Sequence, residues 1–365
     1  GKFDMKKALL LPLALIAVGP VAVEAQETRE LPGSRARLGS AVAVPSSIAH
    51  GWLEVPSAVD VGVSLPVSVI RGATDGPTLG VVAGVHGSEY TPILASGRLA
   101  QVIDPSELKG TVLIVHAANP PAFFGRTVYT GPVDGKNLNR VFPGRAQGTL
   151  SERIADVLVR EVMAHSDFLL DLHSGDANED LRPYVGYYGQ AGDAEVIASS
   201  RAMAYAFGTP LIVRFPQSFS DAAIYAGGAG VVLGRPAIDV EVGGRGRAAD
   251  AEIDLVVNGV LRVLRHLDMI GMNSDATPAR SVVAPVEIVQ RSSARSPLDG
   301  AFLPAVSPGE WVAEGSTLGT VQSLHGDDAR TVLAPASGVV LVLLATPPIR
   351  EGEWVATIGH LPTGR

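Results

Sequence analysis

The chain has 365 residues, of which 46% are hydrophobic and 18% charged, and its formal net charge is -8. This length and composition predict a globular protein with a sizeable core, divided into two or three domains. The acidic balance argues against a general nucleic-acid binder, which needs a basic face. Because the chain has no cysteine, disulfides, thiolate metal sites and a cysteine nucleophile are excluded, and any metal must be held by His, Asp or Glu.

Residues 1–25 have the pattern of an export signal. Lys6 and Lys7 precede an apolar run from Leu9 to Val18, and Val23-Glu24-Ala25 resembles a cleavage site. The apolar run is shorter than the ~20 residues of a spanning helix, so we expect a cleaved signal peptide and no stable membrane insertion after its removal. Residues 1–4 precede Met5 and are interpreted as a remnant of cloning. An exported chain without cysteine is compatible with a bacterial periplasm.

Residues 26–48 have no regular pattern, and we expect a loose lead-in there. Further along, apolar strand-like runs alternate with amphipathic helices, an order that predicts an α/β sheet covered on both faces. The expected strands span 65–70, 78–85, 111–117, 168–172, 211–214 and 237–242. The expected helices span 91–103, with Thr91 as its cap, a segment after the capping box of Thr149 and Glu152, 194–207 and 252–269.

The C-terminal part has a different pattern. A polar segment at 273–280 predicts a boundary between a catalytic domain (26–272) and a smaller all-β domain (281–362). Short β-type runs punctuated by Gly and Pro support the second domain. These runs span 301–306, 317–322, 331–334, 339–344 and 354–358.

A first candidate site lies in Gly84-Val85-His86-Gly87-Ser88-Glu89, which follows an apolar strand. His86 and Glu89 at the end of a strand can both point at one metal ion, and imidazole and carboxylate are ligand types that zinc takes. A lone His-x-x-Glu is a weak signal, and the competing interpretation is a buried His86 bonded to backbone with Glu89 capping a helix. The flanking glycines favour a site, because glycine permits close backbone approach.

The best third ligand is His173, at the end of the apolar strand Leu169–Leu172. Ligands of α/β sheets bind beyond the carboxyl ends of the strands, where both proposed ligand groups lie. Asp171 shares a strand face with His173 and could accept the second imidazole N–H. His116 also ends a strand and is the alternative third ligand.

Glu241 is the candidate general base. It lies in Ile238-Asp239-Val240-Glu241-Val242-Gly243-Gly244, again at a strand end. A carboxylate in such an apolar strand is buried, which is costly unless the group is paired or functional. Glu241 is preferred to Asp239 because it lies closer to the end of the strand.

The long segment 119–148 supplies cations. Arg126 and the Asn139-Arg140 pair lie among glycines and prolines rather than on a helix face. Arginine binds carboxylates bidentately, so one arginine could hold a substrate carboxylate while another stabilises an oxyanion. The alternative is that these are ordinary solvated loop arginines.

Taken together, these pieces resemble the succinylglutamate desuccinylase and aspartoacylase family, a branch of the zinc carboxypeptidase-like hydrolases. The matching motifs occur in the family's order between about residues 78 and 244. They are Gly84-Val85-His86-Gly87-Ser88-Glu89, Asn119-Pro120-Pro121-Ala122-Phe123, Asp134-Gly135-Lys136-Asn137-Leu138-Asn139-Arg140-Val141-Phe142-Pro143-Gly144, Asp171-Leu172-His173-Ser174-Gly175 and Val240-Glu241-Val242-Gly243-Gly244.

The resemblance implies a zinc-carboxypeptidase-like mixed sheet flanked by helices, with a C-terminal β-domain that leans on the active site. It implies one Zn²⁺ per chain on His86, Glu89 and His173. It also implies Glu241 as general base and acid, Arg126 near the scissile carbonyl, and Asn139 with Arg140 near the substrate carboxylate. The export signal is a departure from the best-known relatives, which work in the cytoplasm.

The expected function is therefore metal-assisted hydrolysis of an amide in an N-acyl amino acid or a related carboxylate-bearing amide. The alternative is a zinc carboxypeptidase acting on short peptides, including those of the cell wall. The C-terminal pattern also resembles a lipoyl-type carrier, which needs a lysine at a hairpin tip for covalent attachment. No lysine follows Lys136, so covalent carriage is excluded. A non-heme iron oxygenase would use similar ligands but has no clear need of Glu241 and the arginines.

Overall fold

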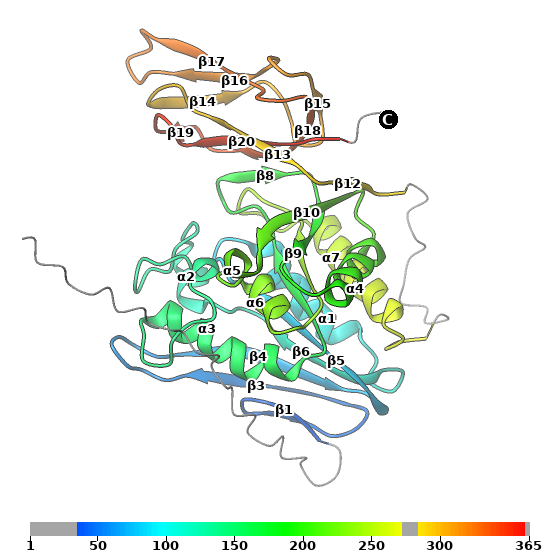
Figure 1. The fold of residues 1–365 in the computed structure, drawn as a ribbon. Coiled ribbons are helices and arrows are strands. Elements are labelled where there is room, and N and C mark those ends of the chain that lie inside the picture. The colour runs from blue at the N-terminus through cyan, green and yellow to red at the C-terminus, as the bar shows by residue number, and fades with distance from the viewer. Residues whose placement is uncertain (1–34, 272–283, 362–365) are drawn as a thin grey trace, which may run out of the picture.

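The computed structural model describes residues 35–271 and 284–361. The expected signal peptide, the lead-in as far as residue 34 and the polar segment 273–280 lie outside these described residues. Figure 1 shows a large region of sheet and helices and, above it, a smaller C-terminal region made of strands. This arrangement confirms the predicted fold class, a mixed sheet flanked by helices with a C-terminal all-β region. No helix in the described ranges is long and apolar enough to cross a membrane.

A nine-stranded mixed sheet, in the order β12-β10-β9-β11-β7-β5-β6-β4-β3, forms the centre of the large region. Its strands are β3 (Ser47–Val55), β4 (Val63–Arg71), β5 (Thr74–Ala83), β6 (Lys109–Val115), β7 (Phe168–His173), β9 (Tyr184–Gln190), β10 (Leu211–Ser218), β11 (Ala237–Glu241) and β12 (Val286–Ile288). β5, β7 and β11 run parallel as neighbours, so their carboxyl ends lie together. Side chains just beyond these ends can therefore converge on one site.

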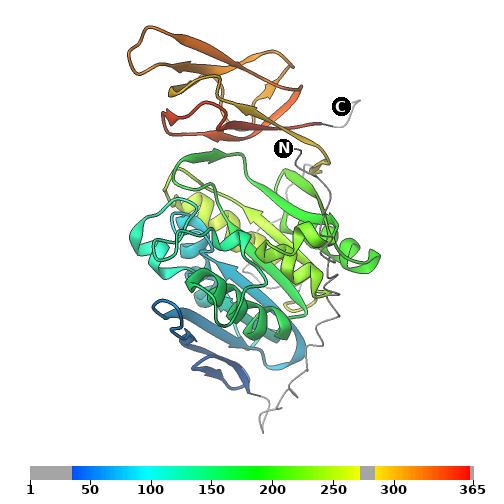
Figure 2. The same ribbon diagram turned by 60° about the vertical axis from the view of Figure 1, so that its left-hand side comes forward.

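Helices cover both faces of this sheet. On one face lie α1 (Tyr90–Val102), α4 (Ala194–Phe207) and α7 (Asp250–His266), and on the other lie α3 (Leu150–Glu161) and α6 (Ala226–Val232). Each face has its own apolar core, because successive strand residues point to opposite sides. Figure 2 shows the two helix layers with the sheet between them.

This alternation decides where the polar residues of the central strands point. In β7, Leu169 packs in the core beneath α3 and α6, whereas Leu170 and Leu172 pack in the opposite core. Asp171 and His173 therefore face the side of α3 and α6. The same parity in β11, where Ala237 belongs to the core of this side, directs Asp239 and Glu241 there as well.

The C-terminal region consists of two small sheets around a separate apolar core. One sheet contains β13 (Arg291–Arg295), β15 (Trp311–Val312), β18 (Gly338–Leu344) and β20 (Trp354–Gly359), and the other contains β14 (Gly300–Pro304), β16 (Thr317–Gln322), β17 (Ala329–Leu333) and β19 (Pro348–Ile349). Two strand pairings join the regions: β8 (Glu179–Leu181) pairs with β18, and β12 pairs with β10 of the large sheet. The C-terminal region is thereby held against the carboxyl ends of the central strands.

Several local expectations were wrong. Residues 35–48 contain the hairpin β1 (Ala36–Leu38) and β2 (Ala41–Ala43) and the start of β3, rather than a loose lead-in. The N-cap position of α1 is Glu89, whose side chain makes no capping hydrogen bond, rather than Thr91, and α7 ends at His266. The segment 119–148 contains the short helices α2 (Pro120–Gly125) and η1 (Leu138–Arg140). Two further helices, α5 (Phe219–Ala222) and α6, and a 3-10 turn, η2 (Met163–His165), were not expected.

Candidate active site

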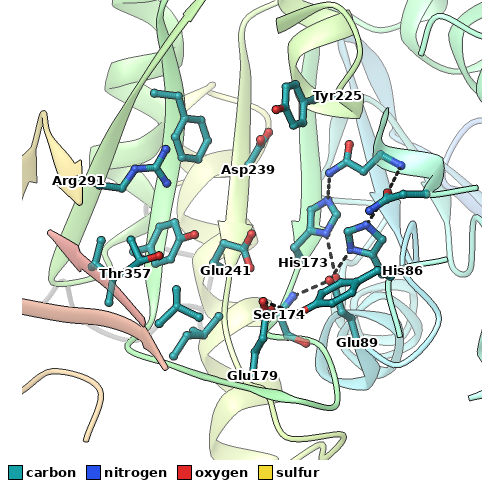
Figure 3. A pocket seen from close by; sticks show the side chains of 18 of the residues that line it. His86, Glu89, His173, Ser174, Glu179, Tyr225, Asp239, Glu241, Arg291 and Thr357 are labelled. Atoms are coloured by element: carbon teal, nitrogen blue, oxygen red, sulfur yellow. Dashed lines mark hydrogen bonds and ion pairs between the residues drawn. The ribbon is translucent and has the colours of Figure 1, made fainter. Parts of the chain in front are cut away.

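The structure brings His86, Glu89 and His173 together at the adjacent ends of β5 and β7. All three are buried, and they can offer ligand atoms that lie within 4.8 Å of one another. The Glu89 carboxylate lies between the two imidazoles, with Oε1 2.6 Å from His86 Nδ1 and Oε2 2.8 Å from His173 Nδ1. The centroids of the two imidazole rings are 5.2 Å apart. The convergence predicted from strand ends is thus present (Figure 3).

Close backbone packing allows this convergence. A side chain at Gly87 would meet the backbone of Ala122, because an ideal Cβ there would lie 2.1 Å from the Ala122 carbonyl carbon. The loop after β5 can therefore turn tightly against the start of α2 only with glycine at this position. The turn carries the chain from His86 to Glu89, which occupies the N-cap position of α1 without a side-chain capping hydrogen bond.

The Nε2 atom of each histidine also lies within hydrogen-bond distance of a side-chain oxygen. His86 Nε2 lies 3.0 Å from Asn137 Oδ1, and His173 Nε2 lies 3.0 Å from Asp171 Oδ2. Both partners are acceptors, so they favour the imidazole tautomer that carries its proton on Nε2 and directs the Nδ1 lone pair toward Glu89. Asp171 was predicted in this role from its position in the strand, whereas Asn137 was not.

The charges of the three residues favour a bound cation. Burial alone raises the pKa of Glu89, but the two imidazoles more than offset this effect and lower its pKa to about 2. Burial alone lowers the pKa of His173, and the carboxylates of Asp171 and Glu89 reverse this and raise it. Two imidazole nitrogens and an ionised carboxylate, buried and converging, are the donor set that fits a catalytic zinc with an open position.

Glu241 faces the same cavity from the end of β11, where it pairs in register with His173. Burial raises the pKa of Glu241 well above its ordinary value, and the carboxylates of Glu89, Glu179 and Asp239 raise it further, against the opposing effect of His173. Among the described residues, no group donates a hydrogen bond to this carboxylate. A partly buried carboxyl group with a raised pKa and no hydrogen-bond donor on its oxygens can exchange protons with a bound molecule.

Asp239 lies two residues before Glu241 and has a different environment. Its Oδ2 accepts a hydrogen bond from the Tyr188 hydroxyl at 2.9 Å, while Oδ1 is buried without a partner. Burial, followed by the neighbouring charge of Asp171, raises the pKa of Asp239 to about 7. One of its oxygens is thus already engaged, in contrast to those of Glu241.

The three predicted residues of the segment 119–148 are in different positions. Arg140 lines the cavity, stacks over Tyr225 at 4.6 Å and donates from Nη1 to the Asn139 carbonyl at 2.6 Å. The Asn139 side chain is buried, accepts from the Ala226 N–H at 2.8 Å and lies 3.4 Å from His173 Nε2. Arg126 is exposed at the end of α2 and is not among the residues that line the cavity.

The sequence did not indicate a second group of polar residues beside the cluster. Asp176 accepts a hydrogen bond from the Ser88 hydroxyl and another, at 2.7 Å, from the Tyr129 N–H. Glu179 accepts from the Tyr129 hydroxyl at 2.9 Å. Burial and the Glu89 charge raise the pKa of Asp176 to about 6. The only sequence signal was that Asp176 and Glu179 follow shortly after the end of β7.

The competing third ligand, His116, is engaged elsewhere. Its Nε2 lies 2.6 Å from Ser68 Oγ and its Nδ1 lies 3.0 Å from Ser96 Oγ, and it does not line the cavity. The structure therefore favours His173 over His116.

The cavity has a volume of about 400 Å³ and is walled by both regions of the protein. The large region contributes the His-Glu-His cluster, Glu241 and a set of aromatic residues. The C-terminal region contributes Arg291, Leu341, Val342, Trp354 and Thr357.

Comparison with known proteins agrees with this arrangement. The chain belongs to the succinylglutamate desuccinylase/aspartoacylase family, whose catalytic domain matches residues 75–267. The crystal structure of a succinylglutamate desuccinylase/aspartoacylase from Rhodobacter sphaeroides superposes with a TM-score of 0.77 at 27% identity, covering 87% of this chain and 96% of that one. The product-bound ectoine utilization protein EutE (DoeB) from Ruegeria pomeroyi gives a TM-score of 0.77 at 27% identity, covering 90% and 99%.

One relative has a more specific name. N-alpha-acetyl-L-2,4-diaminobutyric acid deacetylase from Halomonas elongata is 33% identical over 232 residues, which represent 61% of this chain and 65% of that protein. The match therefore spans just under two thirds of the relative's length.

Proposed function

We propose that this protein is a zinc-dependent hydrolase that cleaves the amide bond of an N-acyl amino acid. The observation that carries the proposal is the buried His86–Glu89–His173 cluster, which shares a cavity with the unengaged carboxyl group of Glu241. His86 Nδ1, His173 Nδ1 and the Glu89 carboxylate would hold the ion. When bound, zinc polarises a carbonyl group and lowers the pKa of a coordinated water toward about 7.

Glu241 performs the proton transfers in this proposal. Its carboxylate takes a proton from the attacking water and then delivers it to the leaving nitrogen, so that an acid and an amino acid are released. The raised pKa suits the first step, because a carboxylate that holds its proton more tightly is a stronger base. Asp171 and Asn137 keep the imidazoles in the orientation that the cluster needs.

Arg140 is proposed to anchor the substrate carboxylate at the cavity wall, where its guanidinium lies over Tyr225. Asn139 supports it by fixing the local backbone through its hydrogen bond to Ala226. A contact of Arg126 with the scissile carbonyl stays a prediction that would require the segment after α2 to approach the cavity.

The size of the cavity supports a small substrate. About 400 Å³ accommodates an N-acyl amino acid more readily than an extended peptide, and the C-terminal region closes one side. The relative from Halomonas elongata is a deacetylase of an N-acetylated amino acid, which is the same class of reaction.

The decisive experiment compares the wild type with Glu241→Gln after loading with zinc. We expect Glu241→Gln to bind zinc as tightly as the wild type and to lose at least about 10²-fold in kcat on N-acyl amino acids, because the amide cannot take the proton. Glu314→Gln, at an exposed position outside the cavity, is the matched control. Full activity in Glu241→Gln, or hydrolysis undiminished after zinc removal by a chelator, would refute the proposal.

We also propose that the chain is exported to the periplasm with cleavage near Gln26. Fractionation of the expressing cells and N-terminal sequencing of the mature protein test this point directly.

A further inference from the structure

A row of aromatic rings along the cavity wall connects two arginines. Tyr225 and Tyr188 have ring centroids 6.4 Å apart, and Tyr188 and Phe215 have centroids 5.2 Å apart. Arg140 lies over Tyr225 at 4.6 Å, and Arg291 lies over Phe215 at 5.0 Å. All five residues line the cavity, so the wall has a guanidinium group at each end.

The position of Arg291 is fixed by strand pairing. β12 pairs with β10 so that Ile288 lies opposite Val213, and the chain then turns into β13, which begins at Arg291. Phe215 lies two residues beyond Val213 in β10, directly under the guanidinium. The ring of Phe215 occupies the space that a side chain at Gly186 would need, since an ideal Cβ there would lie 2.1 Å from the ring.

The guanidinium of Arg291 has no acidic partner among the described residues. Other arginines of the described residues form ion pairs, such as Arg245 with Asp180 at 3.1 Å and Arg201 with Glu287 at 2.5 Å. In the cavity, Glu179 accepts from Tyr129, and Asp239 accepts from Tyr188. In Figure 3, Glu241 lies between Arg291 on one side and His173 on the other.

We infer that Arg291 is a specificity-determining residue that binds a second anionic group of the substrate, a carboxylate at the end remote from the His-Glu-His cluster. This inference rests on the proposed function, in which Arg140 holds the first carboxylate. A half-buried guanidinium without a counter-charge is stabilised by a carboxylate that forms charge-assisted hydrogen bonds with it. The aromatic row between the arginines provides an apolar surface for the connecting carbon chain.

The second carboxylate could belong to the amino-acid side chain or to the acyl group, and two substrate pairs distinguish these sources. N-acetylglutamate is compared with N-acetylglutamine, and N-succinylalanine with N-butanoylalanine. We expect the wild type to prefer the charged member of one pair, with the difference in KM rather than kcat. Arg291→Gln should reduce kcat/KM for that member by about ten- to hundredfold more than for its neutral counterpart.

Arg291→Lys should keep part of the preference, because it keeps the charge without the planar fork. Arg295→Gln, at the other end of the same strand, is the matched control, since Arg295 is exposed and donates to the Gly352 carbonyl. The inference is overturned if the wild type shows no charge preference in either pair. It is also overturned if Arg291→Gln keeps the preference, or lowers the rates for all four substrates equally.

A binding measurement separates this inference from the proposed reaction. The dissociation constants of the uncleaved amides are measured by calorimetry on zinc-loaded Glu241→Gln, with and without Arg291→Gln. Charge-selective binding that depends on Arg291, in a protein whose wild type cleaves none of the four amides, would refute the hydrolase and support the subsite. Cleavage of these amides by the wild type without charge-selective binding would support the hydrolase and refute the subsite.

Discussion

At the scale of single residues, the two histidines of the cluster are supported by partners of different charge. His173 is backed by the carboxylate of Asp171, and His86 by the neutral amide of Asn137. The amide oxygen of Asn137 also accepts from the Asn139 N–H at 2.8 Å, so it joins the orientation of His86 to the turn η1. The two supports differ in strength, because a charged acceptor holds an imidazole more firmly than a neutral one.

Asn137→Ala is therefore expected to weaken zinc binding by about 10–100-fold, the usual effect of removing a group that orients a metal-binding histidine. Competition with a chromophoric chelator measures the affinity. Asn258→Ala, on α7 and away from the cavity, serves as the control. Unchanged affinity in Asn137→Ala would show that η1 and Glu89 orient His86 without this bond.

The half-buried His116 gives a prediction about pH. Burial, helped by nearby His50, lowers the pKa of His116 from its ordinary 6.5 to about 4. The unfolded chain therefore takes up a proton at a higher pH than the folded protein does. The free energy of unfolding should fall by about 3 kcal/mol as the pH drops from about 6.5 to about 4, and this component is fully present above 6.5.

Denaturant unfolding at a series of pH values measures this effect. His116→Gln should flatten the fall over that pH range, whereas His165→Gln, at an exposed position, should keep it. If the free energy of unfolding depends on pH in the same way for the wild type and His116→Gln, the pH dependence does not come from His116.

At the scale of elements, α3 is tied to the loop between β3 and β4 by the fully buried Arg153. Its Nη2 pairs with Asp60 Oδ1 at 2.7 Å and donates to the Val61 carbonyl at 2.5 Å, and its Nη1 donates to the Gly148 carbonyl at 2.8 Å. The loop between β3 and β4 and the turn just before α3 thus both depend on one guanidinium group.

Arg153→Met should lower the free energy of unfolding by about 3 kcal/mol, because it leaves a partly buried carboxylate and two carbonyl groups without their donor. Arg160→Met, on the exposed side of the same helix, should cost less than about 1 kcal/mol. Urea denaturation of both variants provides the comparison. Equal losses would mean that the buried pair contributes no more than a surface pair.

The elements that were predicted correctly are those whose sequence pattern is determined by a buried environment. β5, β7 and β11 are largely apolar in their buried parts because both faces of the sheet are covered, and α4 was predicted with its observed limits. β9 was missed because Gly186 and Gly189 interrupt its pattern. These glycines accommodate Phe215 and Arg214 of the neighbouring strand, a requirement visible only after folding.

At the scale of the whole molecule, the cluster could be predicted and the opposite wall could not. His86, Glu89 and His173 follow apolar strands, so the general geometry of parallel sheets was enough to bring them together. Arg291, Trp354 and Thr357 reach the cavity only because β8 pairs with β18 and β12 pairs with β10. Such pairings between distant segments leave no periodic signal in the sequence.

Trp354 tests the contribution of that wall. It lines the cavity from β20 and donates from Nε1 to Thr357 Oγ1 at 2.9 Å. Trp354→Ala should raise KM several-fold with little change in kcat or zinc affinity, because the residue lies on the wall opposite the cluster. Steady-state kinetics of this variant and of Trp311→Ala, whose side chain is exposed, provide the measurement. A fall in kcat at constant KM would place Trp354 among the reacting groups instead.

The division of the cavity between two parts of the chain has an evolutionary consequence. The reacting groups belong to strands whose register is determined by a large shared core, where most substitutions are harmful. The facing wall belongs to a compact β-unit with its own core, whose cavity-facing side chains can vary without disturbing the central sheet. Substitutions in β13 and β20 can therefore change the substrate specificity of related proteins while the residues that cleave the bond stay the same.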